Sequence, residues 1–132
     1  MKQAGKIPTK EEIVQLFQTH ERQWTRIKSS TDSLTWDSFP WPMLKRPNSV
    51  EELTTLAISG YILSPLYPGD KTKSSKDRIK EHIRRWHPDR FDTQMLPRVV
   101  EAQKEKVKEG AGLVARGLSE LLTRSNVHDV FS

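Results

Sequence analysis

The sequence predicts a mainly α-helical fold, in which a helical hairpin is preceded by an N-terminal amphipathic helix and an extended strap rich in proline and tryptophan. Three observations lead to this prediction. Apolar residues recur at helical spacing in several segments, helix-capping sequences precede most of these segments, and prolines cluster where the spacing is lost. With 34% hydrophobic and 30% charged residues, the 132-residue chain can build one small domain with a modest core.

The first helix is expected from about Thr9 to Lys28. Thr9 stands three residues before Glu12, the spacing of a reciprocal capping box at a helix start. One stripe of this helix is formed by Ile13, Leu16, Phe17, His20, Trp24 and Ile27. Because its large aromatic side chains would be unfavourable in water, we expect the helix to dock on the rest of the chain, with docking on a partner as the alternative.

The strap runs from Ser29 to Pro47 and is expected to be extended. Its apolar side chains alternate with polar residues and prolines, which forbids a regular helix. These apolar residues and prolines are Leu34, Trp36, Phe39, Pro40, Trp41, Pro42 and Pro47. We expect the aromatic side chains to cover the helical core, whereas the alternative is a proline-rich ligand presented to an aromatic groove of another protein.

A second helix of about three turns is predicted to end near Gly60. Ser49 lies three residues before Glu52 and repeats the capping signature. The apolar face of this helix comprises Val50, Leu53, Leu56 and Ala57. The segment from Tyr61 to Lys73 contains the turn signal Pro68-Gly69-Asp70 and is expected to be an exposed connection.

The third helix is predicted from about Ser75 to Trp86, with Ser74 as its cap. Ile79, Ile83 and Trp86 share one face of it by their spacing. The other faces are basic and carry Lys76, Arg78, Lys80, Arg84 and Arg85. Pro88 is expected to stop the helix, because the residue before a proline is pushed out of helical geometry.

The last helical segment is expected from about Pro97 to Thr123, paired with the basic helix. Its apolar stripe comprises Val100, Val107, Ala111, Val114, Leu118 and Leu121. Gly110, Gly112 and Gly117 would each weaken a helix by up to about 1 kcal/mol relative to alanine. Either helices approach closely at these glycines or the segment breaks there.

The chain is therefore expected to divide into three parts. Residues 1–47 form the N-terminal helix and strap, residues 48–124 form the helical domain, and residues 125–132 form a C-terminal tail. The net charge of +5 and the isoelectric point near 9.6 favour an acidic partner: nucleic acid, an anionic membrane face or an acidic protein surface. Charge alone does not choose among these partners.

Several classes of protein are excluded by composition. The chain has no cysteine, which rules out disulfides, thiolate nucleophiles and cysteine-ligated metal sites. This composition fits a protein of a reducing compartment, the nucleus or the cytoplasm. No stretch approaches the roughly 18 apolar residues that span a bilayer, so no membrane is expected. Neither a zinc-ligand spacing nor a nucleophile arrangement involves the histidines, which are His20, His82, His87 and His128. We expect no enzyme, no metal and no cofactor.

One motif carries a resemblance. The segment Ile79–Phe91, which reads IKEHIRRWHPDRF, resembles the second helix and HPD motif of J domains, with a basic amphipathic helix before it and a helical segment after it. In J domains this tip and the basic helix engage an acidic face of a DnaK-type chaperone and promote its ATP hydrolysis. The resemblance implies a rigid docking tip with a basic surface beside it. The residues are His87, Pro88 and Asp89 at the tip and Arg78, Lys80, Arg84 and Arg85 on the surface.

A wider match covers the chain from about Glu11 to Leu122. The aromatic-bearing first helix, the strap LTWDSFPWP, and RRWHPDRF followed by a helix that ends in LSELL resemble the C-terminal J-like region of the NF-kappa-B inhibitor-like proteins. Members of that family are nuclear proteins linked to transcriptional regulation and RNA processing. Two functions are therefore expected as alternatives: a protein-interaction module that acts as a co-chaperone, or a non-chaperone adaptor in a nuclear protein complex.

Two further alternatives remain open at this stage. The tip is an ordinary helix stop if Asp89 bonds the backbone amides of the next turn and His87 packs on Trp86. Nucleic-acid binding is indicated by the basic helix and by three lysines, which are Lys104, Lys106 and Lys108. Acidic residues alternate with these lysines, a pattern more typical of a solvated helix, so protein docking is favoured over nucleic-acid binding.

Overall fold

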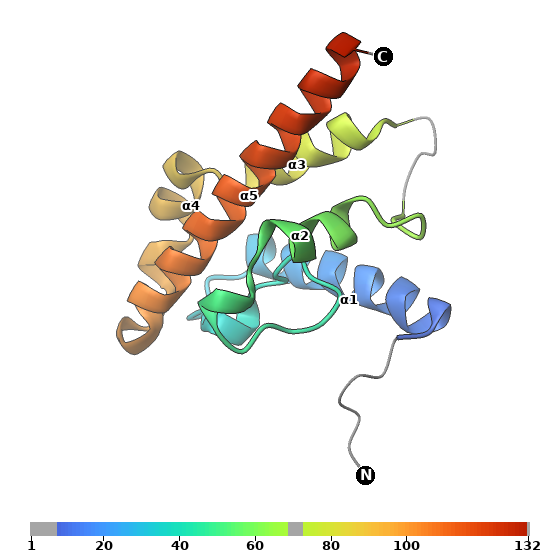
Figure 1. Ribbon diagram of the computed structural model, residues 1–132. Helices are drawn as coiled ribbons and strands as arrows, with labels where there is room; N and C mark the ends of the chain where they lie inside the picture. Colours follow the sequence, from blue (N-terminus) through green and yellow to red (C-terminus); the bar gives the residue numbers. More distant parts are fainter. Residues whose placement is uncertain (1–7, 69–72, 132) are drawn as a thin grey trace.

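The structure is a computed structural model that describes residues 8–68 and 73–131, with side chains up to residue 125. The described residues are mainly helical, as the sequence predicted. The α-helices are α1 (Lys10–Ser29), α2 (Thr55–Ile62), α3 (Ser75–Trp86), α4 (Pro88–Gln94) and α5 (Lys104–Phe131), and short 3₁₀ helices lie at Trp36–Ser38, Val50–Glu52, Leu96–Arg98 and Glu101–Gln103. Figure 1 shows α5 crossing the molecule, with α2, α3 and α4 in contact with it and α1 along the base of the view.

Helix α1 begins as predicted. The Thr9 hydroxyl accepts a hydrogen bond from the Glu12 amide at 3.1 Å, and the Thr9 amide donates to the Glu12 carboxylate at 2.8 Å. The buried side chains of this helix are Phe17, His20, Trp24 and Ile27. The aromatic stripe therefore packs against the rest of the chain and is not exposed for a partner protein.

The strap covers the core, as expected from its tryptophans. Trp36, Phe39 and Trp41 are all buried. The Trp36 indole donates to the Pro47 carbonyl at 2.8 Å and the Trp41 indole donates to the Trp36 carbonyl at 2.9 Å, so both rings bury their polar atom with a partner. These contacts favour the core-covering interpretation over a proline-rich ligand.

The second helix differs from its prediction. It begins at Thr55, where the Thr54 hydroxyl accepts from the Ala57 amide at 3.1 Å, and Ser49 caps only a short 3₁₀ turn without a side-chain bond. The reason lies in Glu52, whose carboxylate accepts from the Asn48 amide at 3.2 Å and so does not complete a capping box with Ser49. Leu56 was predicted on the apolar face and is instead 84% exposed.

Helix α3 follows the prediction, with Ser74 accepting from the Asp77 amide at 3.1 Å and the helix ending at Trp86. Pro88 stops α3 but does not start a loop. It occupies the first position of α4, where a proline is well tolerated because no amide donor is needed there. The turn between α3 and α4 is thus the single residue His87. The turn signal in the earlier connection lies partly outside the described residues, which omit 69–72.

The last segment was predicted as one helix from Pro97, and this start is wrong. Leu34 forms a parallel bridge with Val99, in which the Leu34 amide donates to the Arg98 carbonyl at 2.8 Å and the Val100 amide donates to the Leu34 carbonyl at 2.9 Å. Because Val99 and Val100 are held extended by this bridge, α5 cannot begin before them. The helix also continues past Thr123 to Phe131, so most of the predicted tail is helical.

The glycines of α5 do not break the helix. A Cβ atom on Gly110 would lie 2.8 Å from Trp36 and one on Gly117 would lie 3.0 Å from Ile58, so both glycines allow close approach. Gly112 has no such neighbour, because the nearest atom, on Arg116, is 3.9 Å away. Close packing therefore explains why glycine occupies two of these three positions, but not the third.

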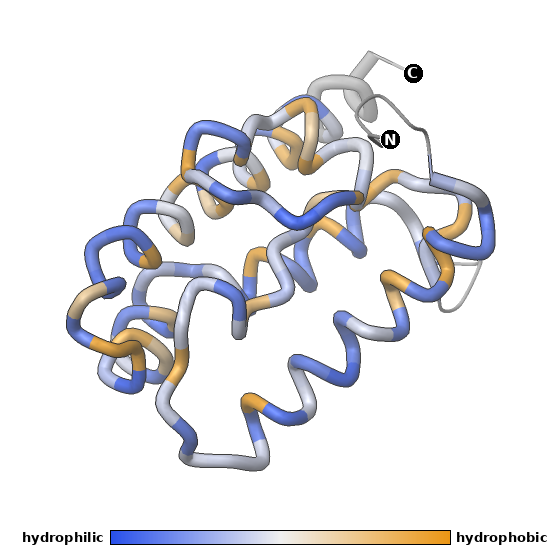
Figure 2. The backbone as a smooth tube through the Cα atoms, turned by 90° about the horizontal axis from the view of Figure 1, so that it is seen from below, coloured by the Kyte–Doolittle hydropathy of each residue, from blue (hydrophilic) through white to orange (hydrophobic). Residues whose placement is uncertain are grey.

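The core is one hydrophobic cluster to which the N-terminal part, the strap and the helical hairpin all contribute. In Figure 2 apolar and polar stretches alternate along the helices, as expected where each helix buries one face. The largest fully buried hydrophobic side chains are Trp86, Phe91, Ile58, Ile62, Ile79 and Leu118. Across the part of the chain that the structure describes, no helix is both long and apolar enough to cross a membrane.

Candidate docking site

The predicted tip forms a fixed corner between α3 and α4. The His87 amide donates to the Ile83 carbonyl at 2.8 Å and closes α3, and the His87 carbonyl accepts from the Phe91 amide at 2.8 Å in the first turn of α4. The His87 ring also caps α4, because its Nδ1 accepts from the Asp89 amide at 3.2 Å. Hydrogen bonds therefore fix the backbone both where α3 ends and where α4 begins.

The two polar side chains of the corner face solvent. The side chain of His87 is 53% exposed and that of Asp89 is 96% exposed. Since Nδ1 of His87 accepts a hydrogen bond, the proton of the neutral ring lies on Nε2. The corner thus offers one N–H donor and one carboxylate acceptor to a partner. The alternative of an ordinary helix stop expected the Asp89 carboxylate to accept hydrogen bonds from backbone amides. Instead, the ring of His87 accepts the hydrogen bond, from the Asp89 amide.

Buried aromatic rings hold the corner from behind. Trp86 stacks on Trp41 with ring centroids 5.0 Å apart and on Phe91 with centroids 5.4 Å apart. Trp24 meets Trp86 edge-on at 5.4 Å. The bulky aromatic residue before the tip is therefore the anchor that joins α1, the strap, α3 and α4.

Two of the predicted surface arginines are partly buried and bind other groups of the chain. The Arg78 guanidinium donates to the carbonyls of Ile62 and Ser64, each at 3.3 Å, and lies 4.9 Å from the centre of the Tyr67 ring. Arg85 donates to the Glu21 carboxylate at 3.2 Å and lies 5.3 Å from the centre of the Trp24 ring. These contacts tie α3 to its neighbours and leave Arg78 and Arg85 only partly exposed.

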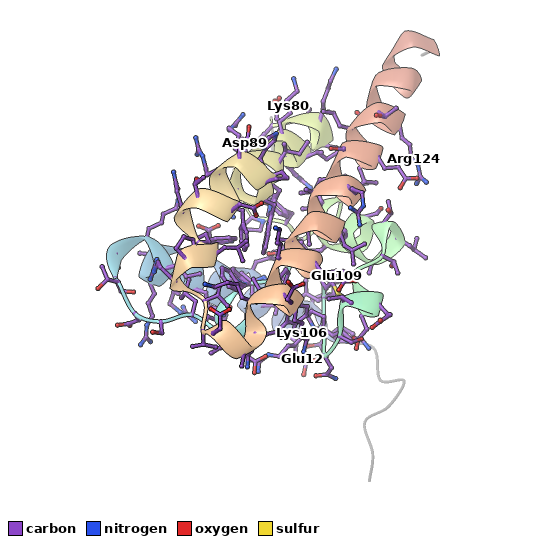
Figure 3. All side chains as sticks on the ribbon, turned by 90° about the vertical axis from the view of Figure 1, so that its left-hand side faces the viewer. Glu12, Lys80, Asp89, Lys106, Glu109 and Arg124 are labelled. Atoms are coloured by element: carbon purple, nitrogen blue, oxygen red, sulfur yellow. The ribbon has the colours of Figure 1, made fainter. Side chains whose placement is uncertain are left out.

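The other predicted cations are available. Lys80 and Arg84 are exposed and form no ion pair with any other described residue. They lie four residues apart on one face of α3, and Figure 3 shows Lys80 and Asp89 projecting from the same edge of the molecule. Arg90, which the sequence analysis did not select, is also exposed beside the corner. Its position next to the motif in RRWHPDRF was the signal that could have identified it.

A groove borders this corner on the side of α1. It has a volume of about 500 Å³ and lies between the C-terminal part of α1, α3 and α4. Its lining residues are Trp24, Lys28, Glu81, Arg84, Arg85, Arg90, Gln94 and Met95. The basic edge of α3 therefore continues into a recess whose walls come from three helices.

Two histidines, one on α3 and one on α1, are buried. His82 contacts the Tyr67 hydroxyl at 2.5 Å through Nε2, and His20 contacts the Tyr61 hydroxyl at 2.8 Å through Nδ1. Burial lowers the pKa of His82 to about 3, helped by the charge of Arg85. Burial also lowers the pKa of His20 to about 4. These histidines are neutral packing residues at physiological pH.

No metal site accompanies this arrangement within residues 8–68 and 73–131, where no cluster of three or more His, Asp or Glu side chains could hold an ion. The chain matches no protein-family model, no curated protein and no solved structure. The resemblance to J domains therefore depends on the residues of the motif alone.

Proposed function

We propose that the chain is a J-like protein-interaction module that docks on a DnaK-type chaperone through the His87-Pro88-Asp89 corner, and that it is a binding protein rather than an enzyme. One observation carries the proposal. A donor and an acceptor stand exposed on a corner whose backbone is fixed on both sides and whose adjacent tryptophan is fully buried. Such a corner loses little conformational entropy when a partner binds it.

Charge around the corner supports an acidic partner surface. Lys80, Arg84 and Arg90 are exposed cations without an ionic partner among the described residues. Exposed charges of one sign chiefly raise the association rate and orient the partner. Arg78 and Arg85 have a different role in this proposal, because they hold α3 in place.

Nucleic-acid binding has less support. Of the three lysines that suggested it, Lys106 donates to the Asn48 carbonyl at 3.0 Å and lies 4.5 Å from the centre of the Trp36 ring. Lys104 pairs with Glu101 at 3.4 Å. Of these three lysines only Lys108 has no partner among the described residues, so this segment does not offer a continuous track for phosphates.

The test is single-turnover ATP hydrolysis by a DnaK-type chaperone in the presence of the chain. We expect the wild-type chain to accelerate hydrolysis and Asp89→Asn and His87→Gln to abolish the effect. Asp77→Asn is the matched control, because Asp77 is also an exposed carboxylate in the first turn of a helix and so has the same effect on helix stability.

Two outcomes contradict the proposal. One is a folded wild-type chain that does not accelerate hydrolysis, which would favour the alternative of a non-chaperone adaptor in a nuclear complex. The other is an equal loss in Asp77→Asn and Asp89→Asn, which would mean that the corner has no special part. Circular dichroism and tryptophan fluorescence of each variant establish that it is folded.

A further inference from the structure

The groove between α1, α3 and α4 is unequally charged. Of the charged residues that line it, Lys28, Arg84, Arg85 and Arg90 are basic and only Glu81 is acidic. Two of these five charges are already compensated, since Arg85 pairs with Glu21 at 3.2 Å and Glu81 pairs with Lys73. Lys28, Arg84 and Arg90 then remain as cations without a partner in the described part of the chain.

The groove also has two apolar lining residues. Trp24 is only 4% exposed, whereas Met95 is partly exposed. Methionine is flexible and polarisable, so it adapts to different apolar side chains. The groove thus combines one partly exposed apolar side chain, that of Met95, with three cations that have no ionic partner among the described residues.

We infer that this groove binds an acidic linear segment of a partner protein, in which an apolar residue is flanked by carboxylates. The carboxylates would meet Lys28, Arg84 and Arg90, and the apolar side chain would enter the groove towards Met95. A volume of about 500 Å³ is within the range of pockets that enclose a small ligand or a few side chains. A recess of this size receives a segment of chain more readily than the flat face of a folded domain.

The same groove is poorly suited to RNA or single-stranded DNA. Proteins hold unstacked bases on exposed aromatic faces. Here the only aromatic residue of the groove, Trp24, is almost completely buried, and the guanidinium of Arg85 lies over its ring at 5.3 Å. The cations therefore have no stacking platform beside them, which favours carboxylates over nucleotides as the occupant.

This site goes beyond the proposed chaperone docking. Lys28 is on α1 and Gln94 and Met95 lie at the end of α4, away from the His87–Asp89 corner in the sequence. Arg84 and Arg90 belong to both surfaces, whereas Lys28 and Met95 belong to the groove alone. Failure of chaperone docking would leave the groove intact, and the two proposals can be tested separately.

The experiment measures fluorescence anisotropy of a labelled synthetic peptide of glutamates around one central leucine, titrated with the full chain. We expect saturable binding that is lost when glutamine replaces glutamate in the peptide. Lys28→Glu and Arg90→Glu should each weaken binding by about tenfold, because a carboxylate in the site would then meet a like charge. Asp89→Asn should leave the affinity unchanged.

Lys10→Glu is the matched control. It reverses the same charge on the same helix, about 27 Å from Lys28 along α1, so it changes the net charge equally without touching the groove. Its affinity for the peptide should equal that of the wild type. The inference is overturned if the peptide does not bind, if Lys10→Glu weakens binding as much as Lys28→Glu, or if an RNA oligonucleotide binds in the groove in place of the peptide.

Discussion

The benzene ring of Trp36 lies directly against the backbone of Gly110, where a Cβ atom would be 2.8 Å from Trp36 Cζ3. The ring cannot easily move away, because its indole N–H is bonded to the Pro47 carbonyl and it packs on the Trp41 ring with centroids 4.3 Å apart. Helix α5 therefore reaches the strap only because position 110 has no side chain.

Alanine at Gly110 and at Gly112 should have opposite effects. Gly110→Ala should lower the free energy of unfolding by about 1–3 kcal/mol, because a methyl group would overpack the tryptophans. Gly112→Ala should raise it by up to about 1 kcal/mol, since its Cβ has room and alanine favours the helix. Urea unfolding followed by tryptophan fluorescence measures both. Equal effects at the two positions would contradict the packing described here.

Arg98 joins the end of α1 to the strap. Its guanidinium donates to the Ile27 carbonyl at 2.8 Å and to the Asp32 carbonyl at 3.2 Å, and so satisfies the open end of the helix. Arg98→Lys should lower the free energy of unfolding by about 1–2 kcal/mol, because one ammonium group cannot reproduce the planar donor set. Exposed Arg22, replaced by lysine in the same way, is the control and should change little. If Arg98→Lys is as stable as the wild type, the guanidinium hydrogen bonds to the two carbonyls do not contribute to stability.

The fold could be predicted from the sequence wherever the signal was local. The caps of α1 and α3 depend on residues three positions apart, and both formed as expected. The start of α5 depends instead on Leu34, which is far away in the sequence and holds Val99 in an extended bridge. The second helix failed for a related reason, since Glu52 bonds the Asn48 amide rather than completing a capping box with Ser49. Competition of this kind is not visible in a spacing rule.

Acid should destabilise the protein through its buried histidines. Burial lowers the pKa of His20 to about 4 and that of His82 to about 3, below the ordinary value of 6.5. The unfolded chain therefore binds protons that the folded chain excludes, so stability is fully present above about pH 6.5 and is lost as the pH falls towards 4. For His20 the loss is on the order of 3 kcal/mol.

The measurement is the urea midpoint of the wild type and of His20→Leu between neutral pH and about pH 4. The variant loses the contact with the Tyr61 hydroxyl and should be less stable at neutral pH, but its stability should fall less steeply with acid. Carboxylates titrate in both proteins, so only the difference between the two curves is interpreted. Parallel curves would mean that the pKa of His20 is the same in the folded and unfolded protein.

The sequence identified residues of the candidate site, but not the contacts that each of them makes. The motif located the end of α3 correctly, because Pro88 restricts the backbone in any context, but α4, which begins at Pro88, was not predicted. The basic residues could not be sorted from the sequence, since helical spacing does not reveal which arginines find a carbonyl or a carboxylate in another segment. Arg78 reaches Ile62 and Ser64 in this way, and the distinction between structural and available cations emerged only from these contacts.

That distinction leads to a pair of variants with complementary effects. Arg78→Ala removes donors from two carbonyls and should lower the free energy of unfolding by about 1–3 kcal/mol, while the protein that remains folded still accelerates chaperone ATP hydrolysis. Arg84→Glu should keep the stability within about 0.5 kcal/mol, because the side chain is exposed and has no ionic partner among the described residues. Its chaperone affinity should fall by about tenfold, since an acidic partner would now meet a like charge. Unfolding curves and single-turnover hydrolysis on the same preparations separate the two effects. The assignment of roles would be reversed if Arg78→Ala impaired docking without a change in stability.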